Sequence, residues 1–408
     1  MEIFYILLIL LVITRALGEV AVRLGQPALV GELLAGIALG AVIRFSPSSF
    51  PVMHAIPDNE VFTAITDLGI FFLMLMTGLE MRPKEVAEKS KGAMFIALGG
   101  LIIPLLVGFL LGWLFLPQSN VRLAQALFIG TALAITAVPV AAKVLMDMDK
   151  LRSTAGKMIV SAAIVDDILG LLLLAVLTAV IRTGEMPDPT GLLLLGGQII
   201  LFMAIVTTIG LYILPHLERV FHRSMSEEFE FSILLVVAFG FAVLAEALHM
   251  HFILGAFAAG LFFTKRTMDT DVFKGVQSRI SGITTGFLAP VFFASIGLHL
   301  DVTAFTSIPM FLVVLIVAAI FCKLIGAGLP AYWIGLSGKD SMIVGIGMSG
   351  RGAVELIVAD IALRAGLFSH PDPTPALVAN LFSAIVIMAV VTTLMTPIGL
   401  RMIVSRES

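Results

Sequence analysis

Charged residues are scarce in this chain. Of its 408 residues, 13% are charged and 59% are hydrophobic, and the mean hydropathy is +1.09. An ordinary soluble domain has about 25% charged residues. The shortage argues against a soluble protein and indicates that most of the chain is surrounded by lipid.

Cysteine and basic charge are also scarce, and each shortage excludes a class of function. The single cysteine, Cys322, has no partner for an intrachain disulfide, and the net charge of −3 argues against a nucleic-acid partner. The sequence has no phosphate-binding loop, no metal-spaced histidine or cysteine cluster, and no nucleophile with an associated base. We therefore expect neither an enzyme nor an ATP-driven pump, and no cofactor.

Long apolar runs occupy almost the whole sequence. A membrane-spanning helix needs about 20 mostly apolar residues, and such runs recur with only short polar breaks between them. The sequence predicts an all-α integral membrane protein, a single membrane domain over residues 1–408 with no soluble regulatory domain. We predict thirteen spans, at residues 3–23, 28–44, 61–80, 93–116, 123–147, 154–182, 191–215, 229–247, 251–265, 283–299, 306–335, 340–366 and 376–403.

The lysines and arginines are divided unevenly between the two sides of these spans. With the spans alternating in direction, 18 of the 25 basic residues fall on the side of the C-terminus and 4 on the opposite side. Cytoplasmic loops are enriched in lysine and arginine. The division predicts a multi-pass protein of a bacterial cytoplasmic membrane with its N-terminus outside and its C-terminus in the cytoplasm.

Two adjacent carboxylates, Asp166 and Asp167, lie near the middle of the sixth span. Charges at that depth usually line a pathway or pair with another charge. Neighbouring residues on a helix point about 100° apart, so one carboxylate can face a partner helix and the other a water-filled cavity. Two close carboxylates repel each other, and this repulsion favours binding of a proton or of a hard cation to one of them. The alternative is a pair that only braces neighbouring helices.

Lys323 lies deep in the eleventh span, within an apolar run. A lysine at that depth requires an anion, and one of the two aspartates is the natural partner. The alternative is an interfacial lysine, should the span end earlier than predicted.

Two spans have features typical of interrupted helices. The fifth contains Pro139 among small residues, and the twelfth contains four glycines between Gly345 and Gly352. Helices broken at corresponding places in two halves of a transporter indicate the central binding site. A plain proline kink and close packing through glycine are the alternatives.

Arg351 lies beside the glycines of the twelfth span and requires a partner. Glu355, one helical turn further along, and Glu246 in the eighth span are the candidates. A purely structural ion pair is the alternative to a role in function.

The segments Ile164–Gly170, Ile135–Leu145 and Ser349–Val358, together with Lys323, resemble the cation:proton antiporter-2 superfamily. Their order and placement are similar to those of its bacterial sodium/proton antiporters with thirteen helices, and the resemblance covers essentially the whole chain.

The resemblance implies an inverted-repeat fold, with a transport core, a dimerisation domain and two broken helices that cross beside the aspartates. It implies that Asp167 is the main site for cation and proton. It also implies that Asp166 pairs with Lys323, that Thr136 helps to line the site, and that the protein is a homodimer.

The function that follows is exchange of a monovalent cation for protons by alternating access. Sodium/proton exchange, electrogenic, is the first expectation, and the transported ions are Na⁺ (or K⁺, Li⁺) and H⁺. Pro139 and Ala137 depart from the more hydroxyl-rich pattern of some sodium exchangers, so potassium/proton exchange stays open. An organic-anion symporter that uses Lys323 and Arg351 and a channel-like sensor subunit are further alternatives.

Overall fold

A computed structural model describes residues 2–45, 59–81, 90–148, 150–183, 189–213, 227–263 and 270–404. Within these ranges the chain is helical, without a strand. The longer helices are α1 (Glu2–Arg23), α2 (Ala28–Phe45), α4 (Glu60–Glu80), α6 (Ser90–Phe115), α7 (Arg122–Ala134), α8 (Val138–Asp147), α9 (Thr154–Thr183), α10 (Pro189–Thr208), α12 (Glu227–Ala247), α13 (Phe252–Phe262), α14 (Thr270–Ile283), α15 (Ala289–His299), α17 (Pro309–Trp333), α18 (Gly338–Gly347), α19 (Ala353–Arg364) and α21 (Leu381–Val404). Two π-helical turns, η2 (Ile209–Ile213) and η3 (Thr284–Leu288), and two short helices, α16 (Ala304–Ser307) and α20 (Ala376–Ala379), complete the described elements.

The prediction of an all-α membrane protein is confirmed for the described part of the chain. Nine of its helices are long and apolar enough to cross a membrane. The helices α7 and α13 are apolar but shorter. Length and composition therefore do not establish the full count of thirteen spans, which stays a prediction.

The helix that contains the predicted tenth span begins earlier than residue 283. A continuous helix, long and apolar enough to be a candidate span, runs from Phe273 to His299, whereas the sequence placed residues before 283 in a loop. In α14, Phe273, Val276 and Ile280 are buried at helical spacing, while Lys274 is exposed. The mean polarity of this amphipathic helix hid its apolar face.

The chain divides into two compact units. The first comprises residues 1–11, 51–84 and 187–293, and the second comprises residues 12–50, 85–186 and 294–408. In the first unit, α13 packs against α4 and α12. The rings of Phe71 on α4 and Phe239 on α12 stack with their centroids 4.6 Å apart. This unit is thus assembled from apolar and aromatic contacts.

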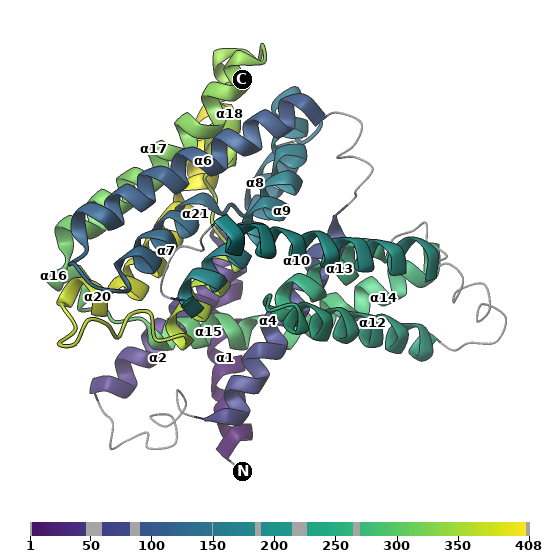
Figure 1. Cartoon of the computed structure of the whole chain (residues 1–408), viewed down its shortest axis with the longest axis horizontal. Coiled ribbons are helices and arrows are strands. Elements are labelled where there is room, and N and C mark those ends of the chain that lie inside the picture. The colour runs from purple at the N-terminus through teal and green to yellow at the C-terminus, as the bar shows by residue number, and fades with distance from the viewer. Residues whose placement is uncertain are drawn as a thin grey trace. The chain divides into compact units, whose positions relative to one another are not determined.

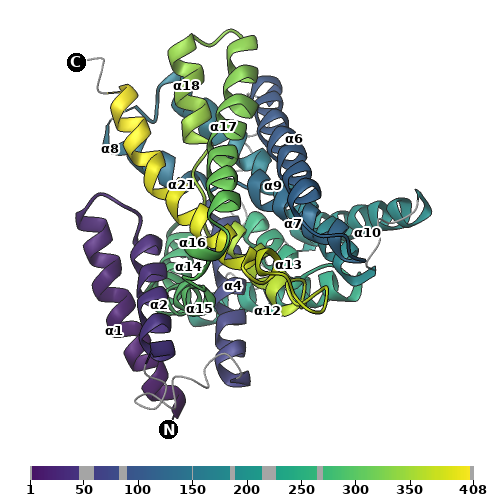
Figure 2. The ribbon, with the colours of Figure 1, turned by 90° about the vertical axis from the view of Figure 1, so that its left-hand side faces the viewer.

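The second unit is built around α6, which runs beside α7 and α17 (Figures 1 and 2). At Gly99 the crossing of α6 and α17 has no room for a side chain, because a Cβ atom there would lie 2.4 Å from the carbonyl oxygen of Gly326. Glycine permits such close approach of helix backbones in membranes. Helix α9 packs against α6, α7, α8 and α18, so the aspartate pair lies on a helix that is surrounded by this unit.

A polar contact joins two helix ends in the second unit. The Arg44 guanidinium at the end of α2 lies 3.0 Å from the Asp301 carboxylate, and Ser383 Oγ accepts a hydrogen bond from the Asp301 backbone N–H at 2.8 Å. Burial alone would raise the pKa of Asp301, but hydrogen bonds from Thr303 and the charge of Arg44 outweigh burial and lower it. The carboxylate therefore stays ionised at neutral pH.

Candidate ion-binding site

The two aspartates lie near the middle of the 30-residue helix α9 and have different surroundings. Asp166 is 1% exposed, whereas Asp167 is only partly buried. Their side chains point about 100° apart, as in any α-helix. One carboxylate is thus enclosed by neighbouring helices while the next retains some access.

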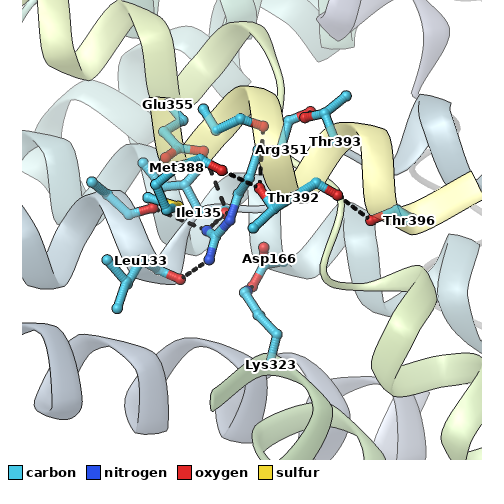
Figure 3. A network of polar contacts seen from close by, with 12 residues as sticks. Leu133, Ile135, Asp166, Lys323, Arg351, Glu355, Met388, Thr392, Thr393 and Thr396 are labelled. Carbon is cyan, nitrogen blue, oxygen red and sulfur yellow. Dashed lines mark hydrogen bonds and ion pairs between the residues drawn. The ribbon is translucent and has the colours of Figure 1, made fainter. Parts of the chain in front are cut away.

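Lys323 extends from α17 toward Asp166 (Figure 3). Its side chain is completely buried, and its Nζ lies 3.6 Å from Asp166 Oδ1. A Cβ atom on Gly100 of α6 would lie 3.9 Å from the same Nζ, so α6 passes close to the ammonium group. The structure thus places Lys323 beside Asp166, the partner that the sequence resemblance implies.

The first helix break lies between α7, which ends at Ala134, and α8, which begins at Val138. Thr136, in the extended stretch between them, is buried, and its Oγ1 has no hydrogen-bond partner within the described structure. Pro139 lies outside that stretch, in the first turn of α8. A proline there is favourable because its missing N–H would have no helical acceptor anyway.

The second break separates α18, which ends at Gly347, from α19, which begins at Ala353. The two breaks are joined directly, because the Ala137 N–H donates a hydrogen bond of 2.8 Å to the Gly350 carbonyl. The first break also lies alongside α9, since a Cβ on Gly170 would contact the Ile135 side chain at 3.4 Å. Gly170 is one turn beyond both aspartates, so the extended stretch runs beside the aspartate turn.

Arg351, within the second break, caps the end of α7. Its guanidinium donates hydrogen bonds to the carbonyl oxygens of Ala132 at 3.0 Å and Leu133 at 2.7 Å, and to that of Ile135 (Figure 3). The last carbonyls of a helix have no partner within it, and a cation there also offsets the negative end of the helix dipole. The buried positive charge thus stabilises a helix end inside the protein.

The other ionisable residues near Arg351 differ in their placement. Glu355, in the first turn of α19, is completely buried, and its Oε2 lies 3.7 Å from Arg351 Nε. Thr393 of α21 donates a hydrogen bond of 3.0 Å to the Arg351 carbonyl. Glu246 lies on α12, in the first unit, with an exposed side chain. Of the two predicted partners of Arg351, the structure therefore places Glu355 beside it, and a contact with Glu246 stays a prediction.

We expect the crossing of the two breaks to be sensitive to a single methyl group. A Cβ on Gly352 would lie 2.4 Å from the Ala137 Cβ, which is too close for two carbon atoms. The Gly352→Ala variant should lose about 1–3 kcal/mol of stability, as is usual for overpacked sites, and should exchange ions more slowly. The thermal unfolding midpoint of the purified protein measures the first effect.

The matched control is Gly338→Ala, because no heavy atom lies within 4 Å of the position of its added Cβ. Replacing Ala137 by Gly in the Gly352→Ala background removes the atom that is struck and should restore the midpoint. An unchanged midpoint in Gly352→Ala alone would contradict the close crossing.

The fold of the chain matches that of a solved transporter. The sodium proton antiporter MjNhaP1 from Methanocaldococcus jannaschii superposes with a TM-score of 0.72 over 99% of this chain and 98% of that chain, at 19% sequence identity. At that identity the match establishes the fold.

Sequence comparison identifies the family. Residues 6–406 match the transmembrane sodium/hydrogen exchanger family. The chain belongs to this sodium/hydrogen exchanger family. It is 32% identical to the Na⁺/H⁺-K⁺ antiporter GerN of Bacillus cereus over 97% of this chain and 95% of that protein. It is also 29% identical to a Na⁺/H⁺ antiporter of Enterococcus hirae over 98% of both chains.

In this family member, the groups at the crossing provide oxygen ligands and buried charges. Carboxylate, hydroxyl and carbonyl oxygens suit hard cations. Among the residues that the structure describes, no three His, Cys, Asp or Glu side chains form a cluster for a metal cofactor. Chemically, a carboxylate in these surroundings suits a monovalent cation or, in its place, a proton.

Two contributors to the site carried no recognisable sequence signal. Thr393 is one of several threonines in α21, and its bond to Arg351 joins residues 42 positions apart. The carbonyl oxygens that Arg351 contacts are more than 200 positions away. The sequence showed only that Arg351, an arginine among glycines, required a partner. It did not indicate that this partner would be a set of backbone carbonyl oxygens.

Proposed function

We propose that this protein exchanges Na⁺ for protons across a bacterial cytoplasmic membrane by alternating access, with Asp167 binding the cation and the proton in turn. The observation that carries the proposal is the partly accessible Asp167 beside the buried Asp166–Lys323 pair, on an apolar helix next to two joined helix breaks. Membership of the sodium/hydrogen exchanger family supports it.

The proposed chemistry is competition at one carboxylate. An ionised Asp167 attracts a monovalent cation, and a protonated Asp167 does not, so each ion displaces the other. The Thr136 hydroxyl, buried without a hydrogen-bond partner in the described structure, would supply a neutral oxygen ligand. Asp166 would hold Lys323 and keep a second carboxylate close to the cation.

The finer features of the mechanism belong to the same proposal. Exchange of two protons per cation would make transport electrogenic. The excess of basic residues on one side supports an external N-terminus and a cytoplasmic C-terminus, and the Arg44–Asp301 contact is compatible with the predicted placement of both residues outside. A homodimer, as the sequence resemblance implies, would present two such sites.

Potassium/proton exchange is a second candidate, because the relative GerN is a Na⁺/H⁺-K⁺ antiporter. The same carboxylate could bind either ion, and selectivity would depend on the size of the oxygen cage around it.

The test is ion exchange by the purified chain in proteoliposomes with an imposed proton gradient. Addition of Na⁺, Li⁺, K⁺ or Rb⁺ outside, over a range of pH, should dissipate the gradient as a saturable function of the transported cation. We expect a response to Na⁺ and Li⁺. A response to K⁺ and Rb⁺ instead favours the second candidate, and no response to any of the four would overturn the proposal, leaving the symporter and sensor hypotheses.

A further inference from the structure

Glu355 is a buried carboxylate that the proposed exchange at Asp167 does not use. It is 0% exposed, and neither of its oxygens has a hydrogen-bond partner in the described structure. Its ion-pair contact with Arg351 Nε, at 3.7 Å, is too long for a hydrogen bond. A fully ionised carboxylate with so few partners is costly in an apolar interior.

The partner of Glu355 does not depend on it. Arg351 donates hydrogen bonds to three backbone carbonyls of the first break, and these remain whether Glu355 is ionised or protonated. Lys323 differs, because its Nζ has no hydrogen bond and Asp166 is the anion beside it. Protonation of Asp166 would therefore strand a buried ammonium, whereas protonation of Glu355 leaves every carbonyl bond of Arg351 in place.

The surroundings of Glu355 contain groups that favour its ionised form and an apolar environment that favours its protonated form. Arg351 and Lys323 attract its negative charge, and its position in the first turn of α19 adds the positive end of a helix dipole. Burial opposes them. Of the helices packed against α19, α7 carries one charged residue, Arg122 at its first position, and α21 carries one, Arg401 in its last turn. Burial, which disfavours the ionised form, and the charges of the central cluster, which favour it, thus together determine whether Glu355 is protonated.

The formal charge of that cluster links Glu355 to transport. Asp166, Asp167 and Glu355 contribute three negative charges, and Lys323 and Arg351 contribute two positive ones, so the fully ionised cluster has a charge of −1. One bound monovalent cation makes it neutral. A proton on Asp167 alone also makes it neutral, whereas protons on both Asp167 and Glu355 give a charge of +1.

We propose that Glu355 binds the second proton of the exchange cycle. The cluster takes up one proton on Asp167 and one on Glu355 on one side of the membrane. When a cation then binds Asp167 on the other side, both protons leave. The two forms differ by one charge, which makes exchange electrogenic. This inference rests on the proposed exchange function and assigns the second proton to a residue outside the aspartate pair.

The test compares proton-to-cation ratios of the wild type and Glu355→Gln, measured from the membrane potential at which net exchange reverses in proteoliposomes. The wild type should exchange two protons per cation. Glu355→Gln should exchange one, with a rate that no longer depends on membrane potential. The matched control is Asp360→Asn on the same helix, since Asp360 is also buried but pairs closely with Arg364 at 2.7 Å; its ratio should equal that of the wild type.

The outcomes separate the two proposals. Absence of exchange in the wild type would overturn the exchange function itself. Active Glu355→Gln with an unchanged ratio would overturn only the role of Glu355, and so would a ratio of one in the wild type. A second measurement decides the question if Glu355→Gln does not fold. Infrared difference spectra with and without Na⁺ are recorded for the wild type and for Glu355→Asp. If Na⁺ removes a carboxylic acid band of the wild type and the frequency of this band is shifted in Glu355→Asp, the inference is supported; if no such band is changed by the substitution, the inference is contradicted.

Discussion

Replacement of Asp167 by Asn should reduce cation-dependent proton movement in proteoliposomes to the level of empty vesicles. The asparagine retains the shape of the side chain and one oxygen, but it can neither ionise nor take up a proton. The partly buried position of Asp167 on α9 means that the amide should fit without rearrangement. Fluorescence of a dye that reports the proton gradient, recorded on addition of Na⁺, measures the effect.

Two companion measurements make this result specific. The thermal unfolding midpoint of Asp167→Asn should be equal to or above that of the wild type, because one uncompensated charge has been removed. Added Na⁺ should raise the midpoint of the wild type by mass action and leave that of the variant unchanged. Exchange retained in Asp167→Asn would remove this residue from the mechanism.

Replacement of Asp166 by Asn should destabilise the protein strongly, by about 3–5 kcal/mol, because removal of one partner leaves the buried Lys323 ammonium uncompensated. Replacement of both residues, in Asp166→Asn with Lys323→Met, should recover most of that loss, since no isolated charge then remains. Thermal or denaturant unfolding of the purified variants measures the stabilities.

The double variant also separates stability from transport. If Asp166 and Lys323 serve only to brace α9 against α17, the double variant should exchange ions as the wild type does. If Asp166 also shapes the cation site, the double variant should fold normally but require more Na⁺ for half-maximal exchange. If the double variant loses as much stability as Asp166→Asn and Lys323→Met lose together when each is measured alone, a direct interaction between the two side chains is contradicted.

The sequence was sufficient to locate the site wherever a charge interrupts an apolar run. Asp166, Asp167 and Lys323 stand out because each is costly in lipid. The spacing of Arg351 and Glu355 predicted their pairing, although Arg351 lies in the break before α19 and not in a helical turn. The all-helical fold follows from the same contrast between apolar and polar residues. These predictions depend on local composition, which a single sequence contains.

Contacts between distant segments could not be predicted in this way. The carbonyls bound by Arg351 belong to a stretch whose residues are apolar or small, and any backbone has such acceptors. The close crossing of Gly99 and Gly326 was equally hidden, because glycine is common in membrane helices. The start of α14 was missed because its lysine and arginine lowered the local hydropathy although one face is apolar.

The hydrogen bond between the Ala137 N–H and the Gly350 carbonyl constrains how the site can be exposed to either side. With Arg351 also bound to the end of α7, the two breaks are fastened to each other from both directions. Separating them would rupture several buried hydrogen bonds at once, each costly in an interior without water. We therefore expect the two breaks to move together in any conformational change, with its hinges elsewhere in the chain.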